Sequence, residues 1–282
     1  MTFSIVGYDP NTGDLGVAVQ SKFLCVGAIV PWARADIGAI ATQGGADHSY
    51  GLKGLSLLES GLSPNQVIAK LVKQGQVGII DSKGNPAAYT GKDCPAWAGH
   101  LVGEHYSCQG NVLISEETVE GMASGFEQES GDLPEKLIAA LQAADREGRG
   151  DARGKQSACL YIVRKKGGYR GYTDNFVDIR IDDHPEPIKE LQRVFELYDM
   201  TFLTREPPEN LLKIEGKIAS DIKRILTELG YLDLNKITLN EEWGEVEHKA
   251  FEWWMSFNNF ENKWRDDGMV WKSIYEHIMR EK

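Results

Sequence analysis

The sequence predicts an α+β protein with two antiparallel β-sheets packed face to face, helices outside them, and a small helical domain after them. Three observations support this fold class. Predicted strands occur as hairpins and predicted helices occur in pairs, which excludes alternating βαβ units. Several strands carry apolar residues on both faces, as strands buried on both sides do. The composition changes after Pro207-Pro208, and five of the seven tryptophans lie beyond that point.

The first predicted hairpin pairs residues 2–8 with residues 15–22, and a cluster of turn-forming residues separates the two strands. If the turn is centred midway between them, antiparallel pairing places Thr2 opposite Ser21. A buried strand that begins at residue 2 is unusual, because chain ends are normally frayed and exposed. We therefore expect the surrounding structure to hold this segment in place.

The other elements follow from hydrophobic spacing and from helix caps. Ser63-Pro64-Asn65-Gln66, for example, has the Ser N-cap, the first-turn Pro and the Gln of a capping box. The segment Gly91–Asn111 looks irregular, and we expect a loop there. Further strands are predicted at 26–33, 37–42, 76–81, 87–90, 157–163 and 176–181, and helices at 52–62, 63–72, 115–128, 133–147, 184–203, 214–229, 242–257 and 266–280.

The bulk composition is that of a globular protein, with 41% hydrophobic and 26% charged residues in a chain of 282. This length favours one large and one small domain. The net charge of −11 argues against nucleic acid and against an anionic membrane as partners. Because the sequence contains no signal-peptide pattern and no long apolar run, we expect a cytoplasmic protein.

No metal and no cofactor are expected. The four cysteines lie far apart without CxxC spacing, and we interpret them as buried free thiols. Asp47 and His48 suggest a metal ligand or a general base, but a single histidine without a second ligand at suitable spacing does not predict a metal site. The loop Gly148–Gly154 lacks the lysine of a phosphate-binding P-loop.

Five motifs occur in order between residue 1 and about residue 200. They are Met-Thr-Phe-Ser-Ile-Val, Gly-Val-Ala-Val-Gln-Ser-Lys-Phe, Val-Pro-Trp-Ala-Arg, Gly-Lys-Gln-Ser-Ala and Val-Asp-Ile-Arg-Ile-Asp-Asp-His-Pro-Glu-Pro-Ile. Together they resemble one uncharacterised bacterial family of unknown function that is grouped with the N-terminal nucleophile (Ntn) hydrolases. The resemblance implies a four-layer αββα sandwich for residues 1–205. Ntn hydrolases generally cleave amide bonds with an N-terminal Thr, Ser or Cys, and only Thr2 can fill that position, once Met1 is removed.

Beyond a predicted linker at 206–212, the C-terminal domain 213–282 shows a second resemblance. Leu229-Gly230-Tyr231-Leu232, followed by Gly244-Glu245-Val246 and Ala250-Phe251, is similar to small three-helix domains called peptidoglycan-binding-like. Its tryptophans would either stack on sugar rings or fill the core of the domain. We expect the second role for most of them, with one or two exposed, because a small domain needs large side chains to fill its core. The partner of this domain is then a glycan or a protein, and a dimerisation role is equally compatible.

Thr2 combines a hydroxyl nucleophile with an α-amine that, once free, has a reference pKa of roughly 8 and can take the hydroxyl proton. Ser21 and Lys22 lie beside it in the predicted register, and the Lys22 ammonium would lower the pKa of that amine. Asn111 follows Gly110 and is a candidate oxyanion donor. Candidate substrate-binding residues are Gln43, Asp151, Arg153, Gln156 and Ser157, because functional side chains gather at such loop-to-strand junctions.

Each of these polar residues also fits a structural role as a cap, a turn former or a buried hydrogen-bonded group. Three hypotheses therefore stay open. In the first, the protein is an Ntn-type amidohydrolase acting on a small or peptide-like substrate through Thr2. In the second, it is a non-catalytic αββα scaffold that binds a ligand or a partner, and its buried strands fit a homo-oligomer. In the third, Ser4, Ser21 or Ser157 is an internal nucleophile.

Overall fold

The computed structural model describes residues 2–94, 96–146, 150–203, 205–233 and 242–281. The chain divides into two compact units, Met1–Val194 and Phe195–Lys282, and the division falls inside helix α5 (Pro187–Phe202). Among the described residues, no helix combines the length and the apolar character that crossing a membrane requires. Glu147, Gly148 and Arg149, at the end of one predicted helix and the start of the following loop, lie outside the described residues.

The larger sheet of the first unit has six antiparallel strands in the order β10-β9-β2-β1-β8-β7. β1 therefore lies in the middle, with β2 on one side and β8 on the other. The predicted register is confirmed, because Thr2 is paired with Ser21 of β2, and β8 adds Asn111 on the other side of Thr2. The strands are β1 (Thr2–Tyr8), β2 (Leu15–Ser21), β7 (Trp97–Gly103), β8 (Tyr106–Leu113), β9 (Ser157–Val163) and β10 (Asn175–Ile181).

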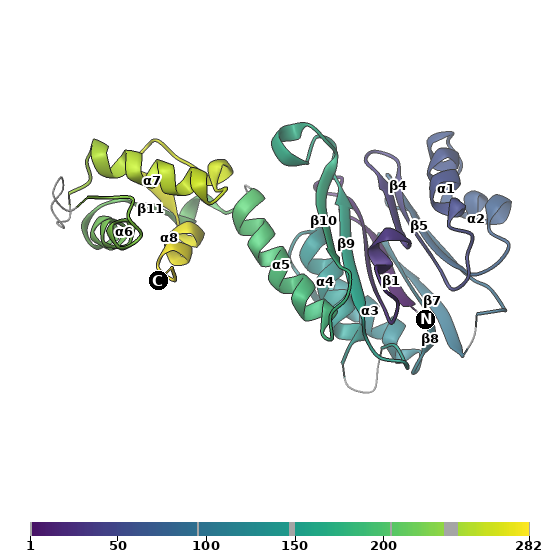
Figure 1. Ribbon diagram of the computed structural model, residues 1–282. Helices are drawn as coiled ribbons and strands as arrows, with labels where there is room; N and C mark the ends of the chain where they lie inside the picture. Colours follow the sequence, from purple (N-terminus) through teal and green to yellow (C-terminus); the bar gives the residue numbers. More distant parts are fainter. Residues whose placement is uncertain (1, 95, 147–149, 204, 234–241, 282) are drawn as a thin grey trace. The chain divides into compact units, whose positions relative to one another are not determined.

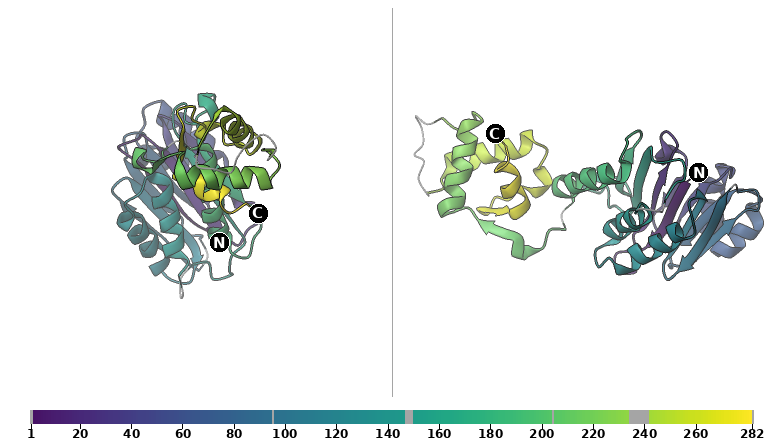
Figure 2. Two further views of the ribbon diagram at one scale, coloured as in Figure 1. Left: turned by 90° about the vertical axis from the view of Figure 1, so that its left-hand side faces the viewer. Right: turned by 90° about the horizontal axis from the view of Figure 1, so that it is seen from below.

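The second sheet has four antiparallel strands and lies face to face with the first (Figures 1 and 2). Helices cover the outer faces of both sheets, so the layers follow in the order helix, sheet, sheet, helix. The predicted fold class, with antiparallel sheets between helix layers, is confirmed. The second sheet comprises β3 (Pro31–Arg34), β4 (Gly38–Gln43), β5 (Gln76–Asp81) and β6 (Pro86–Thr90); α1 (Ser49–Glu59) and α2 (Pro64–Leu71) cover it, and α3 (Glu117–Gln128) and α4 (Leu133–Ala144) cover the six-stranded sheet.

Apolar side chains fill the space between the sheets over most of its area. Val17 and Val19 of β2 pack there with Ala39 and Ala41 of β4, and all four are fully buried. The opposite faces of the same strands pack against the helices, which explains why both faces of these strands are apolar in sequence. Toward the Thr2 end of β1, polar side chains replace the apolar ones.

Two predictions for the first unit are wrong. The segment Gly91–Asn111 was expected to be a loop, but most of it forms β7 and β8. The buried side chains of β8 include Ser107, Gln109 and Asn111, which are polar and hydrogen-bond to groups inside the protein, so the strand has no apolar alternation. The segment predicted as a strand at 26–33 begins instead with a 3₁₀ turn (Val26–Ala28), because the N–H groups of residues 28–30 bond back to residues 25 and 26.

The second unit is helical, with a two-stranded ribbon in place of part of its third predicted helix. Residues 269–271 were expected to be helical but form β12, which pairs with β11 because Val270 packs into the core beside Leu212. The expectation for the tryptophans is confirmed, since Trp254 is fully buried and Trp253 is 64% exposed. The elements are α6 (Gly216–Glu228), α7 (Glu245–Phe257), α8 (Lys272–Ile278), β11 (Leu211–Lys213) and β12 (Met269–Trp271).

Candidate functional site

A cavity of about 550 Å³ opens in the first unit where β1, β4 and β8 end on the same side of the sandwich. Of the residues predicted for the site, Thr2, Gln43, Asn111 and Arg153 line it. Met1 lies outside the described residues. The described lining residues are Thr2, Phe23, Val26, Ile29, Val30, Thr42, Gln43, Gly44, Gly45, His48, Asp93, Asn111, Val112 and Arg153.

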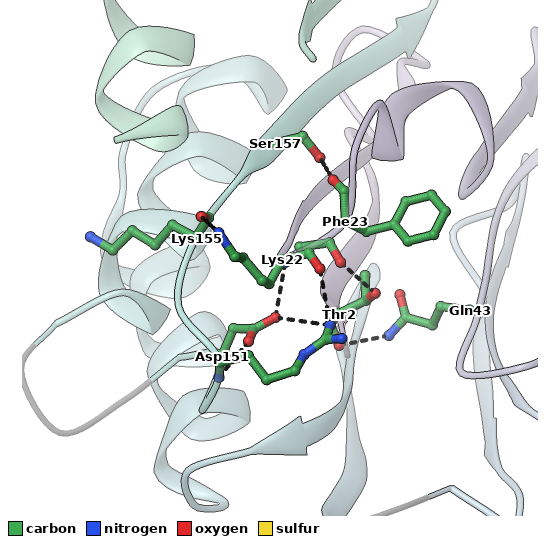
Figure 3. Close-up of polar contacts among 9 residues, drawn as sticks. Thr2, Lys22, Phe23, Gln43, Asp151, Lys155 and Ser157 are labelled. Carbon is green, nitrogen blue, oxygen red and sulfur yellow. Dashed lines mark hydrogen bonds and ion pairs between the residues drawn. The ribbon is translucent and has the colours of Figure 1, made fainter. Parts of the chain in front are cut away.

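Thr2 is held by hydrogen bonds on two sides. Its Oγ1 lies 3.0 Å from the Oγ of Ser21, its partner in the strand register, and either hydroxyl can be the donor. Its backbone carbonyl accepts a hydrogen bond of 3.3 Å from Gln43 Nε2, which reaches across from the other sheet (Figure 3). Only 7% of Thr2 is exposed. The hydroxyl is therefore fixed in place, and Thr2 lines the cavity.

Asn111 and Gln43 meet a residue that the sequence did not single out, Gln76 of β5. Gln76 Oε1 accepts hydrogen bonds from Gln43 Nε2 at 2.8 Å and from Asn111 Nδ2 at 3.0 Å. The Asn111 amide that was predicted as an oxyanion donor thus already donates one hydrogen to Gln76. Its Oδ1 is buried and has no hydrogen-bond partner among the described residues. The signal that could have found Gln76 is a glutamine that opens an otherwise apolar strand, Val77-Gly78-Ile79-Ile80.

A tight turn places two glycines on the cavity wall. The N–H of Ala46 donates to the carbonyl of Gln43 at 3.1 Å, and the two central residues, Gly44 and Gly45, have φ of 64° and 80°. A turn with positive φ at both central positions is of type I′, which glycine adopts without steric cost. In the described structure the N–H groups of Gly44 and Gly45 have no acceptor, and both residues line the cavity.

Lys22 and Asp151 are close to each other but make structural contacts. The Lys22 side chain extends toward Lys155, whose carbonyl accepts its Nζ at 3.2 Å, and not toward Thr2 (Figure 3). The Asp151 side chain is fully buried and accepts the backbone N–H groups of Lys22 at 3.0 Å and of Arg153 at 2.8 Å. Asp151 therefore fixes the backbone on which Arg153 is mounted.

The remaining predicted residues do not line the cavity. Ser157 Oγ donates to the carbonyl of Phe23 and accepts the N–H of Val26 at 3.1 Å, so it holds both ends of a short segment of the cavity wall. Gln156 donates to Asp183 Oδ1 at 3.1 Å, outside the cavity. Ser4 is fully buried and donates to Gln43 Oε1 at 2.7 Å. None of these groups has the access that a nucleophile needs.

The sequence interpretation missed part of the cavity wall. Asp93 lies in a segment that was treated only as a loop, and His48 was considered only as a metal ligand or general base. Burial raises the pKa of the Cys94 thiol, which lies 4.0 Å from the carbonyl of Gly44, so at neutral pH it is a thiol and not a nucleophilic thiolate. Across the described ranges, no group of three or more His, Cys, Asp or Glu side chains could hold a metal ion.

Comparisons with known proteins bear on both units. Residues 2–191 match the model of a family described as "Family of unknown function (DUF1028)". Residues 201–278 match a model described as "Putative peptidoglycan binding domain". No curated protein matches the sequence. A crystal structure of a protein from Silicibacter pomeroyi, assigned to DUF1028, is similar with a TM-score of 0.62 and 27% identity, covering 70% of this chain and 89% of that one.

Proposed function

The chain belongs to the DUF1028 family of unknown function, and we propose that its first unit is an Ntn-type amide hydrolase that acts on a small or peptide-like substrate. One observation carries the proposal. The hydroxyl of Thr2 lies at the wall of a cavity of about 550 Å³ and is held by Ser21, while the adjacent peptide nitrogen becomes a base when the Met1–Thr2 bond is broken. A free α-amine has a pKa of about 8 and accepts a proton readily near neutral pH.

The chemistry follows from these groups. The Thr2 amine takes the hydroxyl proton as Oγ1 attacks the substrate carbonyl, and Ser21 keeps the hydroxyl oriented through their 3.0 Å contact. The negative charge that develops on the carbonyl oxygen is stabilised by the N–H groups of Gly44 and Gly45. The leaving amine takes the proton from the Thr2 ammonium as the C–N bond breaks. Water then releases the acyl group from Oγ1 by the reverse sequence.

The assignment of the oxyanion donors differs from the first expectation. Asn111 Nδ2 donates one hydrogen to Gln76, whereas the turn amides of Gly44 and Gly45 have no acceptor in the described structure. We therefore assign Asn111 a supporting role at the cavity wall. Lys22 is assigned no direct role, because its ammonium contacts the carbonyl of Lys155.

The first test is the intact mass of protein made in cells, followed by turnover of a panel of N-acyl amides and dipeptides. The proposal expects a mass lacking Met1, activity that Thr2→Ser retains in part, and activity that Thr2→Ala abolishes. Thr173→Ala, an exposed site outside the cavity, is the matched control. A chain that keeps Met1 throughout, or activity that survives Thr2→Ala, would contradict the proposal. A retained Met1 would favour the binding scaffold, and activity that survives Thr2→Ala would favour a different nucleophile, with Ser21 the remaining serine candidate.

A second proposal concerns the C-terminal unit, which we expect to bind a glycan through α7. Trp253 and Phe257 lie four residues apart, on one face of this helix, and are 64% and 70% exposed. Aromatic faces of this kind stack on sugar rings. Co-sedimentation of the full chain with insoluble peptidoglycan tests the idea, with Trp253→Ala as the variant and Tyr172→Ala, an exposed tyrosine of the first unit, as the control. Binding that is unaffected by Trp253→Ala would leave a protein partner as the better explanation.

A further inference from the structure

The cavity at Thr2 is lined by two chemically different sets of residues. Val26, Ile29 and Val30 are apolar, as is Phe23, and all four come from the segment between β2 and β3. The turn residues Gly44 and Gly45 add backbone amide groups to the lining. The lining therefore suits an occupant that combines an apolar group with hydrogen-bonding groups.

Arg153 is the only lysine or arginine among the described lining residues, and Asp93 is the only carboxylate. The Arg153 side chain is 49% exposed, so it can meet a ligand without a large desolvation cost. One of its nitrogens, Nη2, donates to the carbonyl of Lys22 at 3.2 Å and lies 3.8 Å from Asp151 Oδ2. A guanidinium carries five N–H donors in a planar fork that matches a carboxylate.

The reactive hydroxyl and the guanidinium are held by neighbouring residues. Thr2 Oγ1 contacts the side chain of Ser21, and Arg153 Nη2 contacts the carbonyl of Lys22, the next residue in the chain. The spacing between the two groups is therefore set by one peptide unit at the end of β2. A ligand that contacts both the Thr2 hydroxyl and the Arg153 guanidinium therefore has its carbonyl group and its anionic group only a few bonds apart.

We propose that this cavity binds N-acyl α-amino acids, or dipeptides, whose C-terminal residue has an apolar side chain. Arg153 binds the free carboxylate of that residue. The proposal rests on the function proposed above and adds the class of substrate. The apolar side chain lies against Val26, Ile29 and Val30, and the amide carbonyl lies at Thr2. A single guanidinium matches the single charge of a carboxylate.

The test compares two probes that differ only in the terminal group, the carboxylate of N-acetyl-L-leucine and the neutral carboxamide of N-acetyl-L-leucinamide. Their binding to the full chain is measured by calorimetry in a Thr2→Ala background, so that neither probe is consumed. We expect the carboxylate to bind about tenfold or more tightly than the amide, as a charge-assisted hydrogen bond implies. Arg153→Gln removes this preference, Arg153→Lys retains part of it, and Arg170→Gln, outside the cavity, leaves it intact.

Equal affinity for both probes, or a preference that Arg153→Gln does not change, would overturn the inference. Circular dichroism and thermal unfolding show whether the Arg153→Gln variant is folded. If it is not, the preference for the carboxylate probe is measured in Arg153→Lys instead. Because the assay measures binding, it still works if no hydrolysis exists. Conversely, Thr2-dependent cleavage of the leucinamide and the leucine compounds at equal rates would refute the substrate class and leave the hydrolase proposal standing.

Discussion

Gln43 and Gln76 face each other at the cavity, where Nε2 of Gln43 donates to Oε1 of Gln76 over 2.8 Å. The two residues are direct partners in the β4–β5 ladder, and both are buried. Through Nε2, Gln76 also reaches the carbonyls of Gly99 and Gly110 in the opposite sheet, at 2.9 and 2.8 Å. Gln76 therefore links the two sheets at the point where the apolar core gives way to the cavity.

Gln76→Glu tests this link. The new carboxylate has no N–H to donate, so one of its oxygens would face the buried carbonyls of Gly99 and Gly110 without a hydrogen bond to either. We expect the free energy of unfolding to fall by about 3 kcal/mol at neutral pH. Urea unfolding followed by circular dichroism measures it. Gln128→Glu, an exposed change on α3, should cost no more than about 0.5 kcal/mol, and equal losses in both variants would contradict the assignment.

Asp14 and Arg164 form a bidentate ion pair, with contacts of 2.6 and 2.7 Å, and the Asp14 side chain is fully buried. Asp14→Ala leaves the guanidinium without its buried partner, so we expect a loss of about 3–5 kcal/mol in the free energy of unfolding. The matched control is Lys165→Ala, which removes an exposed pair with Asp36 and should cost less than about 1 kcal/mol. If the two variants proved equally stable in urea, the buried pair would be energetically unimportant.

Glu247 in the second unit predicts a pH dependence. Burial raises the pKa of Glu247, but backbone N–H groups and the Lys223 ammonium, 3.3 Å away, outweigh burial and hold the pKa below its ordinary value. A carboxyl group whose pKa is lower in the folded protein than in the unfolded chain stabilises the fold at pH values above its pKa in the unfolded chain, about 4.3. This stabilisation is lost as the pH falls through the pKa of the group in the folded protein.

Glu247→Gln should therefore lower the free energy of unfolding by about 3 kcal/mol near pH 7, because the buried Lys223 ammonium loses the carboxylate of Glu247, 3.3 Å away. The difference from the wild type should shrink as the pH falls below about 4. Tryptophan fluorescence suits the measurement, since five of the seven tryptophans follow Pro208. Glu245→Gln, on the exposed face of the same helix, is the control, and a gap that stays constant with pH would contradict the mechanism.

Ser157 is expected to shape the cavity wall. Ser157→Ala removes the hydroxyl that bonds Phe23 and Val26, so we expect a loss of about 1–3 kcal/mol and weaker binding of N-acetyl-L-leucine. Calorimetry and urea unfolding measure the two effects. Ser56→Ala, on the exposed side of α1, should change neither by more than experimental error. Unchanged binding in Ser157→Ala would mean that the wall keeps its shape without this hydroxyl.

Strand pairing near the N-terminal end of the chain could be predicted from sequence, because hairpin geometry is local. A short turn fixes which residues face each other, and this places Thr2 opposite Ser21. Apolar residues on both faces of β1 and β2 likewise indicated a sheet covered on both sides. The layers therefore followed from patterns within a few residues.

The cavity could be predicted only in part, because its wall comes from distant segments. β8 was missed, since the side-chain amides of Gln109 and Asn111 donate hydrogen bonds to partners in β1 and β5, and those partners are invisible to a periodicity argument. Asp93 was missed because it lies in a segment without a periodic pattern. Arg153 was predicted as a binding residue because it lies in a loop before a strand. Only the fold shows that its guanidinium donates to the carbonyl of Lys22, the residue after the partner of Thr2.

The central position of β1 has a consequence for the order of events during translation. β2 emerges from the ribosome directly after β1, whereas β8 begins only at Tyr106, so one edge of β1 stays uncovered until much later. Once both neighbours are in place, Thr2 is 7% exposed. We therefore expect an aminopeptidase to break the Met1–Thr2 bond more readily in the nascent chain than in the folded protein. Added during cell-free synthesis it should trim the protein, and added after folding it should leave the mass unchanged.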